Sequence, residues 1–246
     1  MDRLIYTAMS GAKHVLEQQA STAHNLANVT TTGFRAQLNS FRAVPVISEG
    51  SPTRAFVVDS TVGADFSQGP LQKTGRSLDI AIEGKGWIAV QTADGSEAYT
   101  RRGNLKLNDN GVLQTQDGLN VLGEGGTISV PPEVSISVAK DGTVSSMTTD
   151  TKPGPATEVG RIKLVNPPEN MLVRGDDGLF RLKDGKPAEA DAGVSVAGGT
   201  LEGSNVNAVD AMVNMISLAR SFEMHMSLLK NAESNATKAS QLLALS

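Results

Sequence analysis

The chain has 246 residues, of which 39% are hydrophobic and only 4% are aromatic. A formal net charge of −4 argues against nucleic acid as a partner, and the absence of cysteine excludes disulfides and thiol chemistry. No apolar run approaches the about 20 residues that a membrane-spanning helix needs. With so little core-forming material for its length, the chain is expected to form a multi-part or elongated molecule rather than one dense domain.

The first segment, residues 1–33, is predicted to be the N-terminal helix of a core domain. Residues 2–28 are rich in helix-favouring Ala, Gln and Leu, and residues 30–33 carry the β-branched residues and the glycine that end a helix. Apolar residues recur there at steps of three and four: Ile5, Ala8, Ala12, Val15 and Leu26. The stretch from Leu4 to Ala12 is too polar for a secretory signal, so any export is expected to occur without a cleaved signal peptide.

The next two segments change character. Residues 34–75 show no sustained period and contain Pro45, Pro52 and Pro70, which predicts an extended connector with short strands. From residue 76 to residue 196, alternating apolar positions such as Ile80 and Ile82 predict a β-rich middle domain.

Six turn dipeptides divide this middle domain into short strands. They are Asp94-Gly95, Asn110-Gly111, Asp117-Gly118, Asp141-Gly142, Asp177-Gly178 and Asp184-Gly185. Because Asp-Gly and Asn-Gly supply the positive φ angles of tight hairpins, they predict short antiparallel strands.

The chain ends in a second predicted helix. Residues 197–204 form a short connector, Ser204 or Asn205 is a plausible N-cap, and residues 205–246 form the C-terminal helix of the core domain. Apolar residues at coiled-coil spacing follow along it: Met212, Met215, Ile216, Ala219, Phe222, Met226 and Leu229.

The two terminal stripes predict an assembly interface, because a narrow apolar stripe is stable in water only when another helix covers it. The N-terminal stripe is lined by small residues that let helices approach closely, and the C-terminal stripe contains methionines, which adapt to imperfectly matched neighbours. We therefore take the twelve stripe residues as candidate interface residues.

No catalytic, cofactor-binding or metal-binding set is recognisable, and the chain is predicted not to be an enzyme. The three histidines, His14, His24 and His225, all lie on the terminal helices without metal-ligand spacing. The glycine-rich segments 84–86 and 123–126 lack the Lys-Ser/Thr ending of a phosphate-binding loop. Neither a cofactor nor a small-molecule substrate is expected.

Three blocks, in order along the chain, resemble the flagellar axial proteins, the rod and hook family of bacteria. Residues 23–34 are similar to the signature ANNLANxxTxGF, with His24 in place of an Asn. Residues 78–87 and 99–105 are similar to DxAIxGxGFF and YTRxGxF, with Trp87 in place of a Phe. Residues 203–207, with Met215-Ile216 and the run from Arg220 to Glu223, are similar to LExSNV, MI and RxFE.

The resemblance implies an α+β, multi-part fold, in which long N- and C-terminal helices form a coiled-coil-like core domain beside a β-rich middle domain of short antiparallel strands. The residues of the signature blocks are candidates for a connector and helix-end motif: Asn25, Asn28, Gly33, Phe34, Ser204 and Asn205.

The resemblance also implies a function. It implies a structural subunit of the flagellar basal-body rod, of the proximal-rod type, that self-assembles through its terminal helices into a helical shaft transmitting torque from motor to hook. Its partners would be copies of itself, the other proximal and distal rod proteins, and the flagellar type III export apparatus. Its location would be the rod that crosses the periplasm.

Three alternatives remain open at this point. One is a distal-rod or hook-type protein of the same family. Another is a phage-tail or adhesin-like β module that trimerises through its helices. The third is a secreted carbohydrate-binding or hydrolytic β domain, for which only Trp87, Tyr99 and scattered acidic residues are available.

Overall fold

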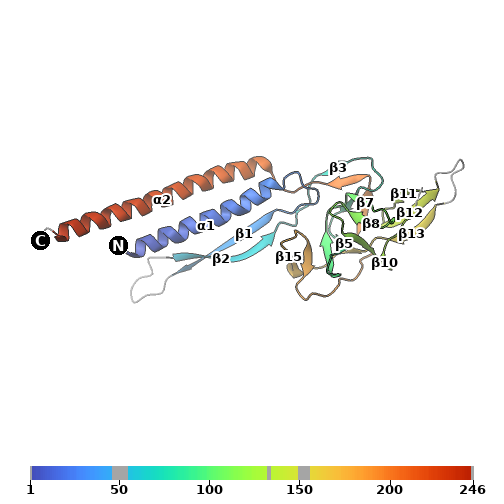
Figure 1. The fold of residues 1–246 in the computed structure, drawn as a ribbon, viewed down its shortest axis with the longest axis horizontal. Helices are drawn as coiled ribbons and strands as arrows, with labels where there is room; N and C mark the ends of the chain where they lie inside the picture. The colour runs from blue at the N-terminus through green and yellow to red at the C-terminus, as the bar shows by residue number, and fades with distance from the viewer. Residues whose placement is uncertain (1, 46–54, 132–133, 149–155, 245–246) are drawn as a thin grey trace. The chain divides into compact units, whose positions relative to one another are not determined.

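The computed structural model describes residues 2–45, 55–131, 134–148 and 156–244 (Figure 1). The chain divides into two compact units. Unit 1 comprises Met1–Asn28, Gln37–Asp65 and Val206–Ser246, and unit 2 comprises Val29–Ala36 and Phe66–Asn205.

Unit 1 consists of two helices and a long β-hairpin. Helix α1 (Asp2–Ala27) lies beside helix α2 (Ala208–Ala244), and α1 also contacts the antiparallel strands β1 (Gln37–Pro45) and β2 (Ala55–Ala64). Ala8, Ala12 and Val15 are buried, so they lie on the covered face of α1. The helices approach closely at Gly11, where an added Cβ would lie 2.5 Å from His225 Cε1.

The prediction of a coiled-coil-like core domain made of the terminal helices is wrong. The described residues contain one long helix near each end and a β-rich middle with many strands, and a long coiled-coil core is not observed. The physical reason is that α1 has neighbours besides α2, because it also packs on the strands β1 and β2. An apolar stripe requires a cover, but it does not specify that the cover is a helix.

The range 34–75, expected to be an extended connector with short strands, holds the two longest strands of the described chain. β1 and β2 are 9 and 10 residues long, and they are joined in register from Gln37↔Ala64 to Pro45↔Ala55 with an irregularity between Ser40 and Phe41. The segment that follows contains β3 (Leu71–Lys73) in unit 2.

Unit 2 is built from short antiparallel strands. Among the described residues, its largest sheet has nine strands, with the path β15-β16-β6-β5-β9-β8-β7 and with β10 on β9 and β14 on β5. In chain order these are β5 (Trp87–Gln91), β6 (Glu97–Thr100), β7 (Leu105–Leu107), β8 (Leu113–Thr115), β9 (Asn120–Gly123), β10 (Gly126–Thr127), β14 (Leu164–Val165), β15 (Leu172–Arg174) and β16 (Phe180–Leu182).

Smaller sheets complete unit 2. A three-stranded sheet contains β11 (Val134–Val138), β12 (Thr143–Thr148) and β13 (Thr157–Arg161). β4 (Ile80–Glu83) pairs with β17 (Ser195–Gly198), β3 pairs with β18 (Thr200–Glu202), and a 3-10 turn (Glu169–Met171) precedes β15. Strands from both ends of the unit are therefore paired with each other.

Five of the six turn dipeptides form hairpin turns as predicted. All six glycines have positive φ, between 68° at Gly185 and 85° at Gly142. Five of the dipeptides connect neighbouring antiparallel strands: β5–β6, β7–β8, β8–β9, β11–β12 and β15–β16. The sixth, Asp184-Gly185, follows β16 instead of joining two paired strands.

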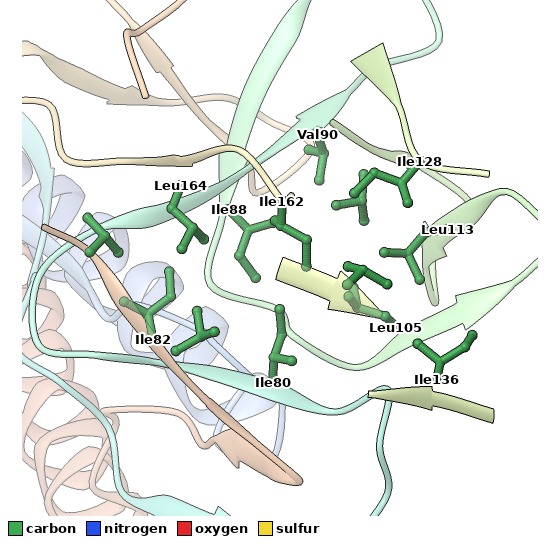
Figure 2. Packing of buried hydrophobic residues seen from close by; sticks show 14 of the residues in the cluster. Ile80, Ile82, Ile88, Val90, Leu105, Leu113, Ile128, Ile136, Ile162 and Leu164 are labelled. Atoms are coloured by element: carbon green, nitrogen blue, oxygen red, sulfur yellow. The ribbon is translucent and has the colours of Figure 1, made fainter. Parts of the chain in front are cut away.

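The hydrophobic core of unit 2 is mainly aliphatic (Figure 2). Ile80, Ile88 and Val90 are fully buried, as are Leu105 and Leu113 from the neighbouring hairpin. Each such side chain contributes about 1.5–3 kcal/mol on burial, so these short strands gain stability mainly from shared packing.

A separate aromatic group lies beside this aliphatic core. Trp87 packs against Phe180 with ring centroids 4.6 Å apart, and Phe66 lies near both rings. It accounts for most of the bulky aromatic packing of unit 2, which the low aromatic content of the chain makes scarce.

Tyr99 provides a test of this core through pH. Its side chain is fully buried, its hydroxyl oxygen accepts a hydrogen bond from the Ala188 N–H at 2.7 Å, and burial raises its pKa from 10.0 to about 12. The unfolded chain therefore loses this proton at lower pH than the folded chain. The contribution of the protonated Tyr99 side chain to the free energy of unfolding is thus present below pH 10 and is lost as the pH rises toward 12. Urea denaturation across this range should show a steeper loss of stability for the native chain than for Tyr99→Phe.

Tyr6→Phe is the matched control, because Tyr6 is 60% exposed. It should leave the pH dependence of the native chain unchanged. Parallel curves for the native chain and Tyr99→Phe above pH 10 would contradict the expectation.

Candidate assembly interface

Helix α2 has one covered side. The apolar or half-apolar positions Met215, Leu218, Phe222 and Leu229 are half-buried and Ala211 and Ala232 are buried, at steps of three and four along the helix. His225 belongs to the same series and lies against Gly11 of α1. This side of α2 is therefore the one that packs on α1 within the same chain.

The exposed part of α2, around the rest of its circumference, also carries large apolar residues. They are Val209, Met212, Val213, Ile216, Met224, Met226 and Leu228, with exposed fractions from 39% to 67%. Single exposed apolar residues are ordinary, but a succession of them along one helix marks a surface that another protein covers. We call these seven residues the outer face of α2.

Some of the predicted interface residues lie on covered faces of the helices, and others are exposed. On α1, Ala8, Ala12 and Val15 are buried within the chain, and Ile5 and Leu26 are half-buried. On α2 the half-buried residues are Met215, Ala219, Phe222 and Leu229, and the exposed residues are Met212, Ile216 and Met226.

Four members of the outer face were missed by the sequence reasoning, namely Val209, Val213, Met224 and Leu228. The signal for them was the pairing of apolar neighbours, such as Met212-Val213, which widens the apolar arc of a helix beyond one stripe. A prediction that follows a single stripe omits this second arc.

The predicted helix-end residues of unit 1 make backbone contacts. Asn25 Nδ2 donates to the Gln37 carbonyl at 2.9 Å, and the Gln37 N–H donates to Asn25 Oδ1 at 2.7 Å, so one side chain takes the place of a strand neighbour at the start of β1. Asn28 Nδ2 donates to the His24 carbonyl at 2.9 Å, where α1 has left carbonyl groups without helical partners.

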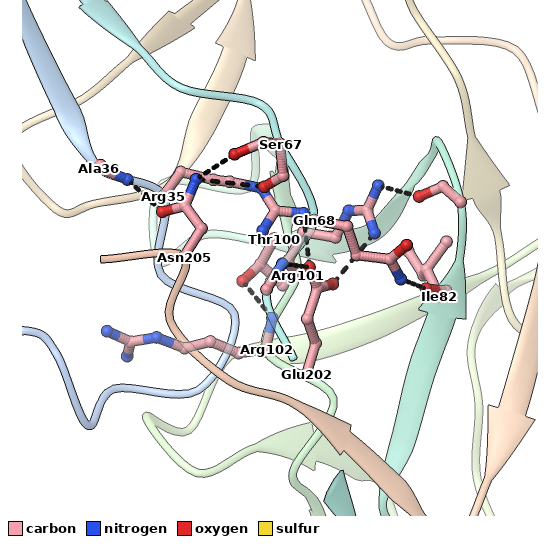
Figure 3. Close-up of polar contacts among 12 residues, drawn as sticks. Arg35, Ala36, Ser67, Gln68, Ile82, Thr100, Arg101, Arg102, Glu202 and Asn205 are labelled. Atoms are coloured by element: carbon pink, nitrogen blue, oxygen red, sulfur yellow. Dashed lines mark hydrogen bonds and ion pairs between the residues drawn. The ribbon is translucent and has the colours of Figure 1, made fainter. Parts of the chain in front are cut away.

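The predicted motif residues of unit 2 bring residues 33–36 alongside residues 202–205 (Figure 3). The Gly33 N–H donates to the Glu202 carbonyl at 2.8 Å, and the Ala36 N–H donates to Asn205 Oδ1 at 2.7 Å. Asn205 Nδ2 donates to the Ser67 carbonyl at 3.1 Å. Phe34 and Ser204 are both buried.

A buried ion cluster lies at the same junction and was not predicted. Glu202 and Arg35 are almost completely buried, and Arg35 Nη2 lies 2.7 Å from Glu202 Oε1. Arg101 Nη1 donates to Glu202 Oε2 at 3.0 Å, and the Gly69 N–H donates to Oε1 at 3.0 Å. Burial lowers the pKa of Arg101, an effect that the nearby Glu202 carboxylate opposes.

The signal for this cluster was weak but present. Arg35 follows the apolar Phe34 and Glu202 follows the apolar Leu201, so each charge stands beside an apolar residue, although both were predicted to lie in connectors. Because charged side chains are rarely buried without partners, such positions indicate an ion pair, although sequence alone does not identify the partner.

The part of the chain that the structure describes lacks two further kinds of feature. Within it, no group of three or more His, Cys, Asp or Glu side chains is arranged to hold a metal ion. Neither described helix combines the length and the apolar character of a membrane span.

Comparison with known protein families identifies the class of protein. Residues 81–146 match the flagellar hook protein FlgE/F/G D1 domain, and residues 197–242 match the flagellar basal body rod FlgEFG protein C-terminal domain. These two matches place the chain among the rod and hook proteins.

Full-length relatives make the assignment more specific. The chain is 49% identical to the flagellar basal-body rod protein FlgF of Escherichia coli K12 and 48% identical to FlgF of Salmonella typhimurium LT2, with 100% of each chain covered. It is 32% identical to the rod protein FlgG of Bacillus subtilis 168, over 95% of this chain and 96% of that one. The chain belongs to the flagellar basal-body rod proteins and is most like FlgF, which confirms the predicted structural rod subunit.

Gly33 allows a test of the contact between residues 33–36 and residues 202–205. Its φ is +66°, and a Cβ would lie 2.4 Å from the Arg101 carbonyl carbon. Gly33→Ala should therefore destabilise the chain through both backbone strain and a clash with backbone, by about 2–4 kcal/mol. The measurement is urea denaturation followed by far-ultraviolet circular dichroism.

Gly75→Ala is the matched control. Gly75 has a similar φ of +75°, but nothing lies within 4 Å of its added Cβ, so this variant reports the strain alone. Equal losses of stability in the two variants would show that the close approach to Arg101 does not matter.

Proposed function

We propose that this chain is a subunit of the proximal rod, and that the outer face of α2 binds neighbouring subunits of the shaft. The observation that carries the proposal is the row of exposed apolar side chains on α2, which includes Ile216 at 57% and Met224 at 62%. The identities of 49% and 48% to two FlgF proteins, against 32% to a FlgG protein, support the proximal rather than the distal type.

Assembly into a shaft follows from the kind of contact that such a face makes. A surface that binds a different surface on the next copy, without closing a ring, generates a helical filament. Copies of this chain and other rod proteins are the proposed occupants of the outer face. The predicted role of Met212, Ile216 and Met226 in assembly is retained in this proposal.

The predicted residues on the covered side have a different proposed role. Ala8, Ala12 and Val15 on α1 and Phe222 on α2 lie on covered faces of their helices, so they support the helix pair that carries the outer face. Their contribution to assembly would be indirect.

The mechanism is mechanical rather than chemical. We propose that torque passes from subunit to subunit through these contacts as the rod turns within the basal body and across the periplasm. The chain would act without a cofactor, a small-molecule substrate or any catalysed reaction, and nucleic acid would not be a partner.

Ile216→Asp tests the proposed interface. Ile216 is exposed in the single chain, so the variant should fold with unchanged circular dichroism and Tm. An unpaired carboxylate buried between subunits should weaken association by a factor of about 100 or more. In cells that lack the native copy, we expect loss of swimming and absence of the variant from isolated basal bodies.

Asn235→Asp is the matched control, because Asn235 is also exposed on α2 but does not belong to the outer face. It adds the same charge and should leave swimming intact. Normal motility with Ile216→Asp would exclude the outer face as an assembly surface.

Export through the flagellar type III apparatus without a cleaved signal peptide is also proposed. The support is the polar character of residues 4–12, which lack the apolar region of a secretory leader. Intact mass measurement on the protein recovered from basal bodies should show a chain that retains residues 4–12. A mass lacking this segment would refute the proposal.

A further inference from the structure

Unit 2 has an open hollow with a largely apolar lining at the edge of its largest sheet. The hollow has a volume of about 600 Å³, and Pro167, Pro168, Met171 and Leu182 line it together with alanines of residues 188–192. Met171 directly precedes the edge strand β15 and is 36% exposed. A hollow of this kind, with apolar side chains open to solvent, indicates a docking surface.

The charged residues that line the hollow are all acidic, namely Asp184, Glu189 and Asp191. Asp184 and Asp191 each accept a backbone N–H two residues further on, at 3.3 Å and 2.8 Å, so their carboxylates hold turns. Lys183, next to this lining, donates to the Asn170 carbonyl at 2.6 Å. Glu189 is exposed and has no hydrogen-bond or ion-pair partner among the described residues.

Glu189 also lines a second hollow, where the other charges are already paired. In that hollow Lys163 Nζ lies 2.8 Å from Glu97 Oε2, and Glu124 is paired with Arg161 at 3.4 Å. Glu189 therefore stands between two hollows as a carboxylate without a compensating cation.

The backbone on both sides of Glu189 is fixed. The Ala188 N–H donates to the Tyr99 hydroxyl at 2.7 Å, and the Asp191 N–H donates to the Leu164 carbonyl at 2.8 Å. A glutamate carboxylate lies within about 8 Å of its own backbone, which is the distance over which charges still attract at physiological ionic strength. Its charge therefore acts on any side chain that enters either hollow.

The outer face of α2 has the complementary character. Met212, Ile216, Arg220, Met224 and Leu228 follow one another at steps of four, and all five are exposed. Residues at this spacing form one ridge along a helix. The arginine in the middle of this ridge has no ion pair among the described residues, so an apolar ridge with one uncompensated cation matches an apolar hollow with one uncompensated carboxylate.

We propose that the hollow lined by Glu189 receives the outer face of α2 from a second copy of this chain, with Arg220 of one copy paired to Glu189 of the next. The contact joins two different surfaces, so each copy keeps one of them free for a further copy, as a helical filament requires. The inference rests on the proposed role of the outer face and adds the surface that it binds.

Charge reversal tests the proposed pair. Arg220→Glu and Glu189→Arg each bring like charges together, so each should lower incorporation into isolated basal bodies about tenfold or more. Both residues are exposed, so circular dichroism and Tm should stay unchanged. The double variant restores opposite charges and should recover the lost incorporation. Lys230→Glu, at an exposed position of α2 outside the ridge, is the control and should incorporate normally.

The outcome separates this inference from the proposed function on which it rests. If Ile216→Asp blocks assembly while Arg220→Glu incorporates normally, or while the double variant fails to recover, the outer face binds another surface and the pairing with Glu189 is overturned. If Ile216→Asp also assembles normally, the inference and the proposed function are both overturned.

Cross-linking locates the contact directly, because the chain has no cysteine of its own. Met224→Cys and Ala190→Cys chains expressed together should form a bismaleimide-linked dimer in isolated basal bodies, and neither chain expressed alone should do so. Ser135→Cys, at an exposed position of β11 that does not line the hollow, takes the place of Ala190→Cys in the control. A dimer no more abundant than in this control would overturn the proposal.

Discussion

The buried carboxylate of Glu202 is the constraint around which unit 2 is organised. A carboxylate removed from water is stable only when positive charges and hydrogen-bond donors surround it. Here Arg35 supplies an ion pair, and Arg101 and the Gly69 N–H donate hydrogen bonds, from distant parts of the chain. Its backbone carbonyl also receives the Gly33 N–H. Removing one partner leaves the others buried and uncompensated, so these segments are expected to order together rather than one by one. The signature residues at both ends of the unit thus serve one electrostatic requirement.

Unit 1 is organised differently, because a small residue lies where its two helices meet and large apolar residues lie on the exposed part of α2. Gly11 lets α1 approach α2 closely within the chain, while the bulky Ile216 and Met224 remain exposed on α2. A single chain gains nothing in stability from displaying such residues in water. Their presence is understandable if the stability that they supply appears only when another subunit covers them, which is the property required of an assembling subunit.

How much of this was predictable from the sequence depends on how local the cause is. The Asp-Gly and Asn-Gly turns were predictable because two adjacent residues set the backbone angles, and both long helices were predictable from their period. The hairpin β1–β2 was not, because its alternation is imperfect and Pro45 suggested a loop. The helix pair was mistaken for a coiled-coil core because an apolar stripe predicts that one side of a helix is buried. It does not predict whether a helix or a sheet covers that side. The pairing of Arg35 with Glu202 was beyond reach, since opposite charges far apart in sequence carry no mark of being partners.

These two features, a buried ion cluster in unit 2 and exposed apolar side chains on α2, suit the proposed mechanical role. The buried charges of Arg101 and Glu202 are paired with each other in the interior of unit 2. Such groups resist displacement because moving either one exposes an unpaired charge, and this stiffness is useful to a part that must carry load without deforming. A subunit that transmits torque needs rigid junctions inside and adhesive faces outside. The ion cluster of unit 2 suits the first requirement, and the outer face of α2 suits the second.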